Sequence, residues 1–232
     1  LIASVAEALS PFGLVVRGGF NPDIGDLVPE FSKGVGSGTL VLVGNTSSDM
    51  WQNFQDSESS RSASADCDDE PLDDWTKSVV DQVAQGLSSR AVYPFEGPPY
   101  HPFLTWAMRA DSVSQSPLGL TIHPAFGLWH AYRAALLFPE VVPISPPENA
   151  EPPCASCGHQ RCLSACPVDA FGAGAYDVPR CLEHLSTAAG VRCLESGCLA
   201  RHACPIGVES AYTPAQAEFH MKAFVRRVPS LI

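Results

Sequence analysis

Basic side chains are scarce in this 232-residue sequence, which holds 14 lysines and arginines against 25 aspartates and glutamates. Nucleic-acid binding depends on clustered basic side chains that contact phosphates. The sequence also lacks a run of about 18 apolar residues, the minimum for a helix that spans a membrane. We therefore expect partners that are neither nucleic acids nor membranes.

Cysteine is nearly absent from the first 150 residues, where Cys67 stands alone, whereas the remainder holds the other eight. Charge divides at the same place, because the first 150 residues carry 18 acidic and 7 basic side chains and the remainder carries seven of each. Two domains explain this coincidence best. We predict domains at 1–145 and 154–232, joined by a proline-rich linker at 146–153.

The opening stretch "LIASVAEALS" has no basic segment and carries Glu7, so it predicts an amphipathic helix and not an export signal. We accordingly expect a cytoplasmic protein. Thiols stay reduced in that compartment, and clustered cysteines there bind metals more often than they form disulfides.

The first domain alternates predicted strands and helices, which indicates an α+β layer structure. The clearest strand is 39–43, apolar and β-branched, and the clearest helix is 75–87. Residues 56–74 are rich in serine and acidic side chains and predict a solvated loop. The stretch 128–138 begins irregularly and ends apolar, and its pattern assigns it to no element.

Two cysteine runs dominate the last third of the chain. The first is "CASCGHQRCLSACP", which begins at Cys154, and the second is "CLESGCLARHACP", which begins at Cys193; both end in Cys-Pro. Cys181 stands between them. In two-cluster proteins, three cysteines of a run surround one [4Fe–4S] cluster, and the cysteine before the proline binds the other cluster.

The last third resembles a bacterial-type two-cluster ferredoxin domain. The isolated "DVPRCLEHLS" resembles the ferredoxin module of epoxyqueuosine reductases and corrinoid reductive dehalogenases. This resemblance implies two crossed ligand sets. One cluster is expected on Cys154, Cys157, Cys162 and Cys204, and the other on Cys166, Cys181, Cys193 and Cys198.

Three gaps between the cysteines are longer than in those families, and two of the longer gaps contain a histidine, His159 and His202. Loss of one cluster is therefore an open alternative. Structural zinc on four ligands is a second alternative, and disulfides are a third. Cys67, in the acidic loop, is expected to be an idle thiol.

The stretch "LGLTIHPAFGLWHAYRAALLFPEVVP", together with "SPFGLVVRGGF" and "GTLVLVGNT", resembles the MMACHC family of cobalamin-processing proteins. That resemblance implies a nitroreductase-like fold for the first domain and a bound cobalamin, with FMN as the second choice. It marks His123, Phe126, Trp129 and Arg133 as candidate cofactor-binding residues.

The same four residues also have a physical interpretation. Phe126 and Trp129 offer flat apolar surface that a macrocycle could cover, and Arg133 is a fixed positive charge suited to an anionic group. The alternative is structural: the two aromatic residues are core, Arg133 pairs with a carboxylate, and His123 is a satisfied polar residue.

Together these patterns predict an iron–sulfur redox protein in which two [4Fe–4S] clusters pass electrons to a corrinoid bound in the first domain. Its partners would be a small-molecule cofactor and a redox protein, and its activity that of a corrinoid-dependent reductase. One alternative is a non-enzymatic ferredoxin-like electron carrier whose first domain docks a partner. Another is a zinc-stapled binding module. Catalytic residues are not predicted.

Overall fold

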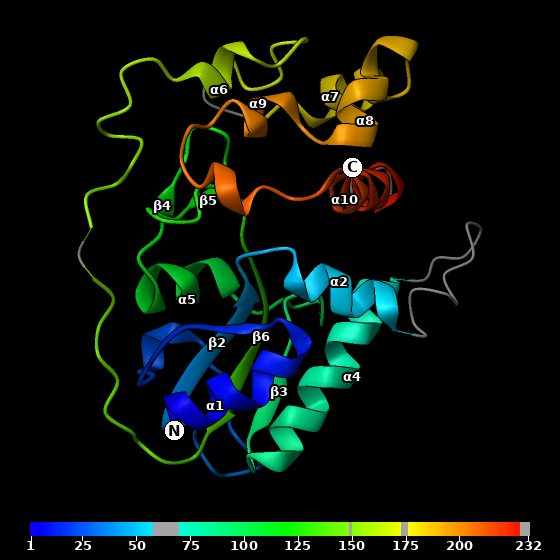
Figure 1. Ribbon diagram of the computed structural model, residues 1–232. Coiled ribbons are helices and arrows are strands. Elements are labelled where there is room, and N and C mark those ends of the chain that lie inside the picture. Colours follow the sequence, from blue (N-terminus) through cyan, green and yellow to red (C-terminus); the bar gives the residue numbers. More distant parts are fainter. Residues whose placement is uncertain (58–69, 149, 173–175, 228–232) are drawn as a thin grey trace. The chain divides into compact units, whose positions relative to one another are not determined.

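The computed structural model in Figure 1 describes residues 1–57, 70–148, 150–172 and 176–227. Helices and β-sheets both occur, which confirms the expected α+β class. No helix in these residues combines the length and the apolar character needed to cross a membrane.

The chain forms two compact units. The first comprises Leu1–Ser112 and Ala131–Asn149, and the second comprises Val113–His130 and Ala150–Ile232. The predicted limits at 145 and 154 remain predictions, and this division departs from them in one stretch. Residues 113–130, expected in the first domain, group with the cysteine-rich part of the chain.

The first unit is built on one antiparallel sheet with the strand order β1-β2-β6-β3, and helices lie against it (Figure 1). Its elements are α1 (Ile2–Leu9), η1 (Ser10–Phe12), β1 (Val15–Phe20), η2 (Ile24–Asp26), β2 (Thr39–Asn45), α2 (Asp49–Asp56), α4 (Pro71–Gly86), β3 (Arg90–Val92), α5 (Phe103–Ala110) and β6 (Ala131–Phe138).

Strand β2 forms the centre of this sheet. All seven of its residues are buried, and Leu42 pairs with Ala135 in the register that joins β2 to β6. The predicted strand at 39–43 is thus confirmed and extended to Asn45. A strand covered on both faces reads as a continuous apolar run, and this is why the sequence reveals β2 so clearly.

Two sequence expectations need correction. Helix α4 begins at Pro71, four residues before the predicted start, because a proline in the first turn and the acidic Asp73 and Asp74 suit a helix N-terminus. Residues 71–74 therefore belong to a helix and not to the loop predicted at 56–74. In addition, the unassigned stretch 128–138 contains β6, which pairs with both β2 and β3.

The second unit consists of a small hairpin and short helices. Its elements are β4 (Ser114–Gln115), β5 (Thr121–Ile122), α6 (Arg161–Ser164), α7 (Val178–Leu185), η4 (Ala188–Gly190), α8 (Val191–Ser196), α9 (Leu199–His202), η5 (Val208–Ser210) and α10 (Pro214–Arg227). Several of these helices span only four to six residues. Helices of that length are not stable alone, so tertiary contacts must hold them.

The core of the second unit joins the hairpin segment to the cysteine runs. Leu118, Ile122 and Leu128 of that segment pack with the buried Ala200 and Cys204, and further cysteines pack around them. Gly127, at φ +56°, lies so close to the backbone of Ile206 that a Cβ there would overlap the Ile206 carbonyl oxygen. Glycine is required at this position for its conformation and for its small size.

Candidate metal centres

Helix α7 brings Cys181 into the centre of the second unit. The Asp177 side chain accepts a hydrogen bond of 2.9 Å from the Arg180 backbone N–H, and Pro179 occupies the first turn. Both features favour a helix start at this point. Cys181 therefore sits on the first turns of a well-defined helix, and this helix sets the direction of its sulfur.

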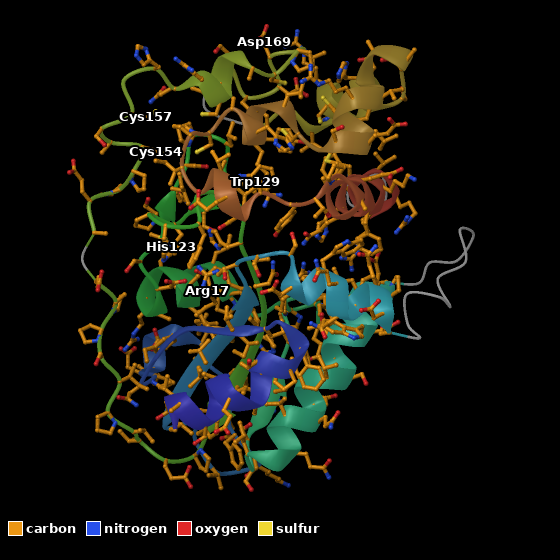
Figure 2. The ribbon with its side chains drawn as sticks, viewed as in Figure 1. Arg17, His123, Trp129, Cys154, Cys157 and Asp169 are labelled. Carbon is orange, nitrogen blue, oxygen red and sulfur yellow. The ribbon has the colours of Figure 1, made fainter. Side chains whose placement is uncertain are left out.

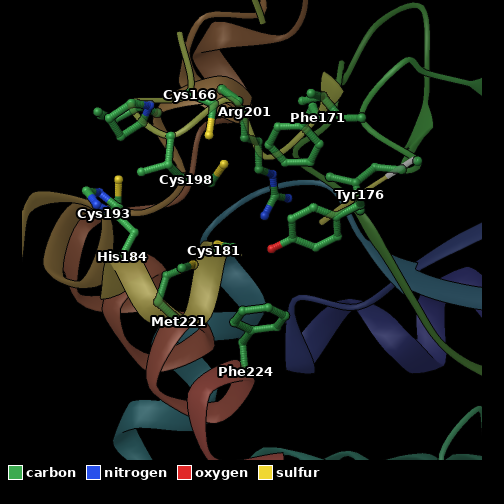
Figure 3. Close-up of a pocket in the computed structure, with 17 residues that line it drawn as sticks. Cys166, Phe171, Tyr176, Cys181, His184, Cys193, Cys198, Arg201, Met221 and Phe224 are labelled. Atoms are coloured by element: carbon green, nitrogen blue, oxygen red, sulfur yellow. The ribbon is translucent and has the colours of Figure 1, made fainter. Parts of the chain in front are cut away.

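A single cavity of about 400 Å³ collects four cysteines of the second unit (Figure 3). The four come from both cysteine runs and from α7: Cys166, Cys181, Cys193 and Cys198. Apolar side chains, among them Phe171, Met221 and Phe224, form most of the remaining wall. The cavity falls within the range of small-molecule sites, and it is far larger than the roughly 30 Å³ that one water fills.

Each of the four cysteine sulfurs in this cavity accepts a hydrogen bond. Cys166 Sγ accepts from the Ala170 backbone N–H at 3.3 Å, and Cys181 Sγ accepts from the Tyr176 hydroxyl. Backbone N–H groups near the start of α9 donate to the sulfurs of Cys193 and Cys198. Such donors stabilise the negative charge of thiolate ligands.

The thiols of the cavity also influence one another electrostatically. Burial raises the pKa of Cys181, and the neighbouring thiols of Cys166 and Cys193 raise it further, while the Tyr176 hydrogen bond lowers it. Burial likewise raises the pKa of Cys198, and Cys181 and Cys193 add to that increase. These mutual effects identify the four thiols as one group.

The other four cysteines form a second group. Burial raises the pKa of Cys154, and the thiols of Cys204, Cys162 and Cys157 raise it further. Cys154, Cys162 and Cys204 also pack in the apolar core around Leu118. Figure 2 labels Cys154 and Cys157 of this group.

The two groups contain the same cysteines as the two ligand sets that the resemblance implied. Cys166 lies in the first run but faces the cysteines of the second, and Cys204 shows the reverse exchange. We call Cys154, Cys157, Cys162 and Cys204 the first quartet. We call Cys166, Cys181, Cys193 and Cys198 the second quartet. All eight are free cysteines, so the disulfide alternative has no support among them. Whether the quartets bind metal stays a prediction.

Within the described part of the chain, no three histidine, cysteine or acidic side chains approach closely enough to hold one metal ion. A tetrahedral zinc ion with Zn–S bonds of about 2.3 Å needs its sulfurs close together. A [4Fe–4S] cluster places its four cysteines on four separate irons, and its ligands are more widely spaced. The lack of a single-ion site among the described residues therefore does not argue against a cluster.

The solved structures that are similar to this chain include the crystal structure of epoxyqueuosine reductase with an epoxyqueuosine-modified tRNA-Tyr stem loop. The sequences are 13% identical, the TM-score is 0.48, and the match covers 91% of this chain and 66% of that chain. No family model matches the chain. No curated protein matches it either. The resemblance to the MMACHC family therefore stays a prediction, and the function must be inferred from the chain's own residues.

The four predicted cofactor-binding residues do not lie in one unit. His123, Phe126 and Trp129 belong to the second unit, and Arg133 belongs to the first. His123 closes a turn, because its Nδ1 accepts hydrogen bonds from the backbone of Ala125 and Phe126 and its ring stacks on Phe126. His123 therefore has hydrogen-bond partners within its own turn, as the structural alternative for this residue expected.

Trp129 is a core residue of the second unit, only 2% exposed. The guanidinium of Arg201 lies 4.3 Å from its ring centroid, and the ring of Tyr212 packs edge-on against it at 5.5 Å. The expectation of open ring surface at Trp129 is therefore wrong within this unit, since both neighbours already cover the indole.

Arg133, on β6, donates a hydrogen bond from Nε to Asn45 Oδ1 at 3.2 Å. Asn45 is fully buried, and its Nδ2 has no hydrogen-bond partner among the described residues. An arginine and an orphaned amide donor thus stand side by side in the first unit.

The histidines in the lengthened gaps do not join the quartets. His159 is exposed, and His202 Nε2 lies 2.8 Å from the Ser196 carbonyl oxygen. Sequence reasoning missed Tyr176 and His184, which line the cavity of the second quartet. The position of His184, three residues after Cys181 on one helix, was the available signal. Cys67 lies outside the described residues.

Proposed function

We propose that the second unit binds two [4Fe–4S] clusters, one on each quartet, and that the protein transfers single electrons. The observation that carries this proposal is the cavity in which Cys166 meets Cys181, Cys193 and Cys198. A position of Cys166 beside the cysteines of the second run is expected if the two cluster sites exchange their fourth ligand.

The residues of the cavity fit a cluster in three respects. Four thiols converge, each sulfur accepts a hydrogen bond, and the rest of the wall is mainly apolar. Low solvent access and hydrogen bonds to sulfur are the means by which proteins tune such clusters. A reducing compartment such as the cytoplasm suits eight free thiols of this kind.

We further propose that the electron acceptor is a corrinoid in the first unit, with flavin as the second choice. When bound, the clusters supply one-electron carriers, and a redox partner protein replaces each electron that leaves. Support within this unit comes from the donor pair of Arg133 and Asn45. Both side chains offer N–H groups to an anionic part of the cofactor.

A second candidate function, a non-enzymatic electron carrier, is favoured by exposed apolar side chains on the first unit. Ile24 in η2, Leu27 just after it and Leu104 on α5 are 101%, 73% and 63% exposed. Side chains of this type mark docking surfaces when they gather. On this interpretation the first unit binds a partner protein and no cofactor.

Metal analysis of anaerobically purified protein tests the cluster proposal. We expect about eight iron and eight sulfide per chain after reconstitution. A value near four would mean that one quartet is empty, and zinc without sulfide would replace the proposal with the zinc-stapled module. The variant Cys67→Ala is the matched control, and its iron content should equal that of the unchanged protein.

Titration with cob(II)alamin separates the two candidate functions. A corrinoid-binding first unit changes the absorption spectrum of the added cobalamin, and single electrons from pre-reduced clusters then reach the bound cobalt in stopped-flow experiments. An unchanged spectrum at hundred-micromolar protein would favour the carrier.

A further inference from the structure

His184 is an unusual member of the second quartet's cavity. It lies on α7, three residues after Cys181, and it lines the same cavity (Figure 3). Its Nε2 is buried and has no hydrogen-bond partner among the residues that the structure describes. Buried polar groups without a partner are rare in native proteins because they cost free energy, so this nitrogen needs an explanation.

The other polar side chains of the cavity are already engaged. The Tyr176 hydroxyl donates to Cys181, and the Arg201 guanidinium donates from two nitrogens to the Leu128 carbonyl oxygen at 3.1 and 2.6 Å. The four remaining polar groups are the cysteine sulfurs. The partner of His184 Nε2 is therefore to be sought among the sulfurs or in what they hold.

We propose that His184 donates a hydrogen bond from Nε2–H to a sulfur of the cluster held by the second quartet. This inference rests on the proposed function. Nε2 carries a proton in one neutral tautomer and in the imidazolium form, so the donor role does not depend on a change of charge. Reduction adds negative charge to the cluster, and a donor to its sulfur stabilises the reduced form more than the oxidised form.

The donor makes the two clusters unequal. His159 and His202, each two residues from a cysteine of the first quartet, are exposed, whereas His184 lines the cavity of the second quartet. This donor therefore raises the reduction potential of the second quartet's cluster and favours electron transfer toward that cluster.

Redox titration of the anaerobic holoprotein, followed by electron paramagnetic resonance, tests this role. At the midpoint potential of the unchanged second cluster, we expect His184→Leu to lower the ratio of reduced to oxidised cluster roughly ten-fold. His184→Gln keeps an N–H donor and should recover part of that ratio. His159→Leu is the matched control and should leave both clusters unchanged. An unchanged ratio in a fully loaded His184→Leu variant would overturn the proposal.

A second measurement needs no variant. Protein labelled with ¹⁵N-histidine should show a weak magnetic coupling between one histidine nitrogen and the reduced second cluster. A strong coupling would identify His184 as an iron ligand, and no coupling would leave it without a role; either result overturns the donor role. The iron and sulfide count of the same sample keeps the two proposals distinct, since clusters without a histidine coupling contradict the inference and absent clusters contradict the proposed function.

Discussion

The two units achieve a folded core by different means. In the first unit, apolar side chains such as Leu40, Leu42 and Leu136 are fully buried in a four-stranded sheet. In the second unit, cysteines pack into the apolar core and the helices are short. Burial of apolar surface stabilises the first unit without help. Small units with little regular structure usually need a metal or another cross-link, so under the proposed function the second unit should depend on its ligands more than the first unit does.

The largest effect should follow from removal of iron, because metal binding to such sites contributes on the order of 10 kcal/mol to folding. We expect amides of α7, α8 and α9 to lose hydrogen-exchange protection on anaerobic chelation, while amides of β2 and β6 keep theirs. Exchange followed by mass spectrometry measures both units in one sample. Equal protection of α8 before and after chelation would contradict the comparison.

Paired cysteine substitutions test the exchange between the quartets. Cys166→Ala with Cys193→Ala removes two ligands of the second quartet, and about four iron should remain. Cys162→Ala with Cys193→Ala removes one ligand from each quartet, and almost no iron should remain. If each run held its own cluster, both double variants would lose all iron. The iron content of the Cys166→Ala, Cys193→Ala variant therefore distinguishes crossed from uncrossed ligation.

A smaller effect is expected where the hairpin segment meets the cysteine core. Gly127→Ala places a side chain at φ +56° and against the Ile206 carbonyl oxygen. Backbone conformation alone costs about 1–2 kcal/mol, and the overlap adds to it. Gly119→Ala is the matched control, since Gly119 has φ +75° with open space around it. The unfolding temperature of the second unit should fall more for Gly127→Ala than for Gly119→Ala. Equal decreases would contradict the close packing of Gly127 against Ile206.

Arg133→Ala tests whether the first unit binds an anionic cofactor. We expect corrinoid affinity to fall by roughly 1.5–3 kcal/mol, because a hydrogen bond to a charged group is lost. Arg90→Ala provides the control, since Arg90 is an exposed arginine that donates to the Glu30 carbonyl oxygen. Spectral titration with cob(II)alamin measures both variants. The same affinity in Arg133→Ala and Arg90→Ala would remove Arg133 from the site.

The smallest effect should come from Tyr176→Phe. This change removes the hydroxyl that donates to Cys181 and keeps the ring that stacks on Phe171 at 4.7 Å. The loss of one hydrogen bond costs about 0.5–1.5 kcal/mol. The second cluster should therefore be lost at a slightly lower chelator concentration than in the unchanged protein, and the first quartet should be unaffected. An equal loss from both clusters would place Tyr176 outside the second site.

The grouping of the cysteines was implied by the resemblance to two-cluster ferredoxins, in which cysteine spacing reflects how a chain wraps around a cluster; the role of these cysteines as ligands remains a proposal. Strand β2 could be predicted for a comparable reason, since its apolar and β-branched residues fit no exposed element. In both cases a local pattern carries the information.

Other features depend on contacts that no local pattern records. Alanine and leucine dominate "AYRAALLF", and these residues favour helices, yet pairing with β2 and β3 makes the stretch a strand. The place of Trp129 was missed for the same reason. Its neighbours Arg201 and Tyr212 lie more than 70 residues away in sequence. The local pattern therefore suggested an indole open to a ligand, whereas these two side chains enclose it.

The path of the chain has a consequence for any attempt to dissect it. The backbone passes between the two units three times, after Ser112, after His130 and after Asn149. A fragment that starts at residue 150 would contain every quartet cysteine and yet lack Leu118, Ile122 and Leu128, around which those cysteines pack. One protease cut at Pro147 would leave two covalent connections intact. The cysteine-rich unit therefore cannot be transferred to another protein as one contiguous stretch of sequence. The hairpin segment at 113–130 would have to be transferred with it.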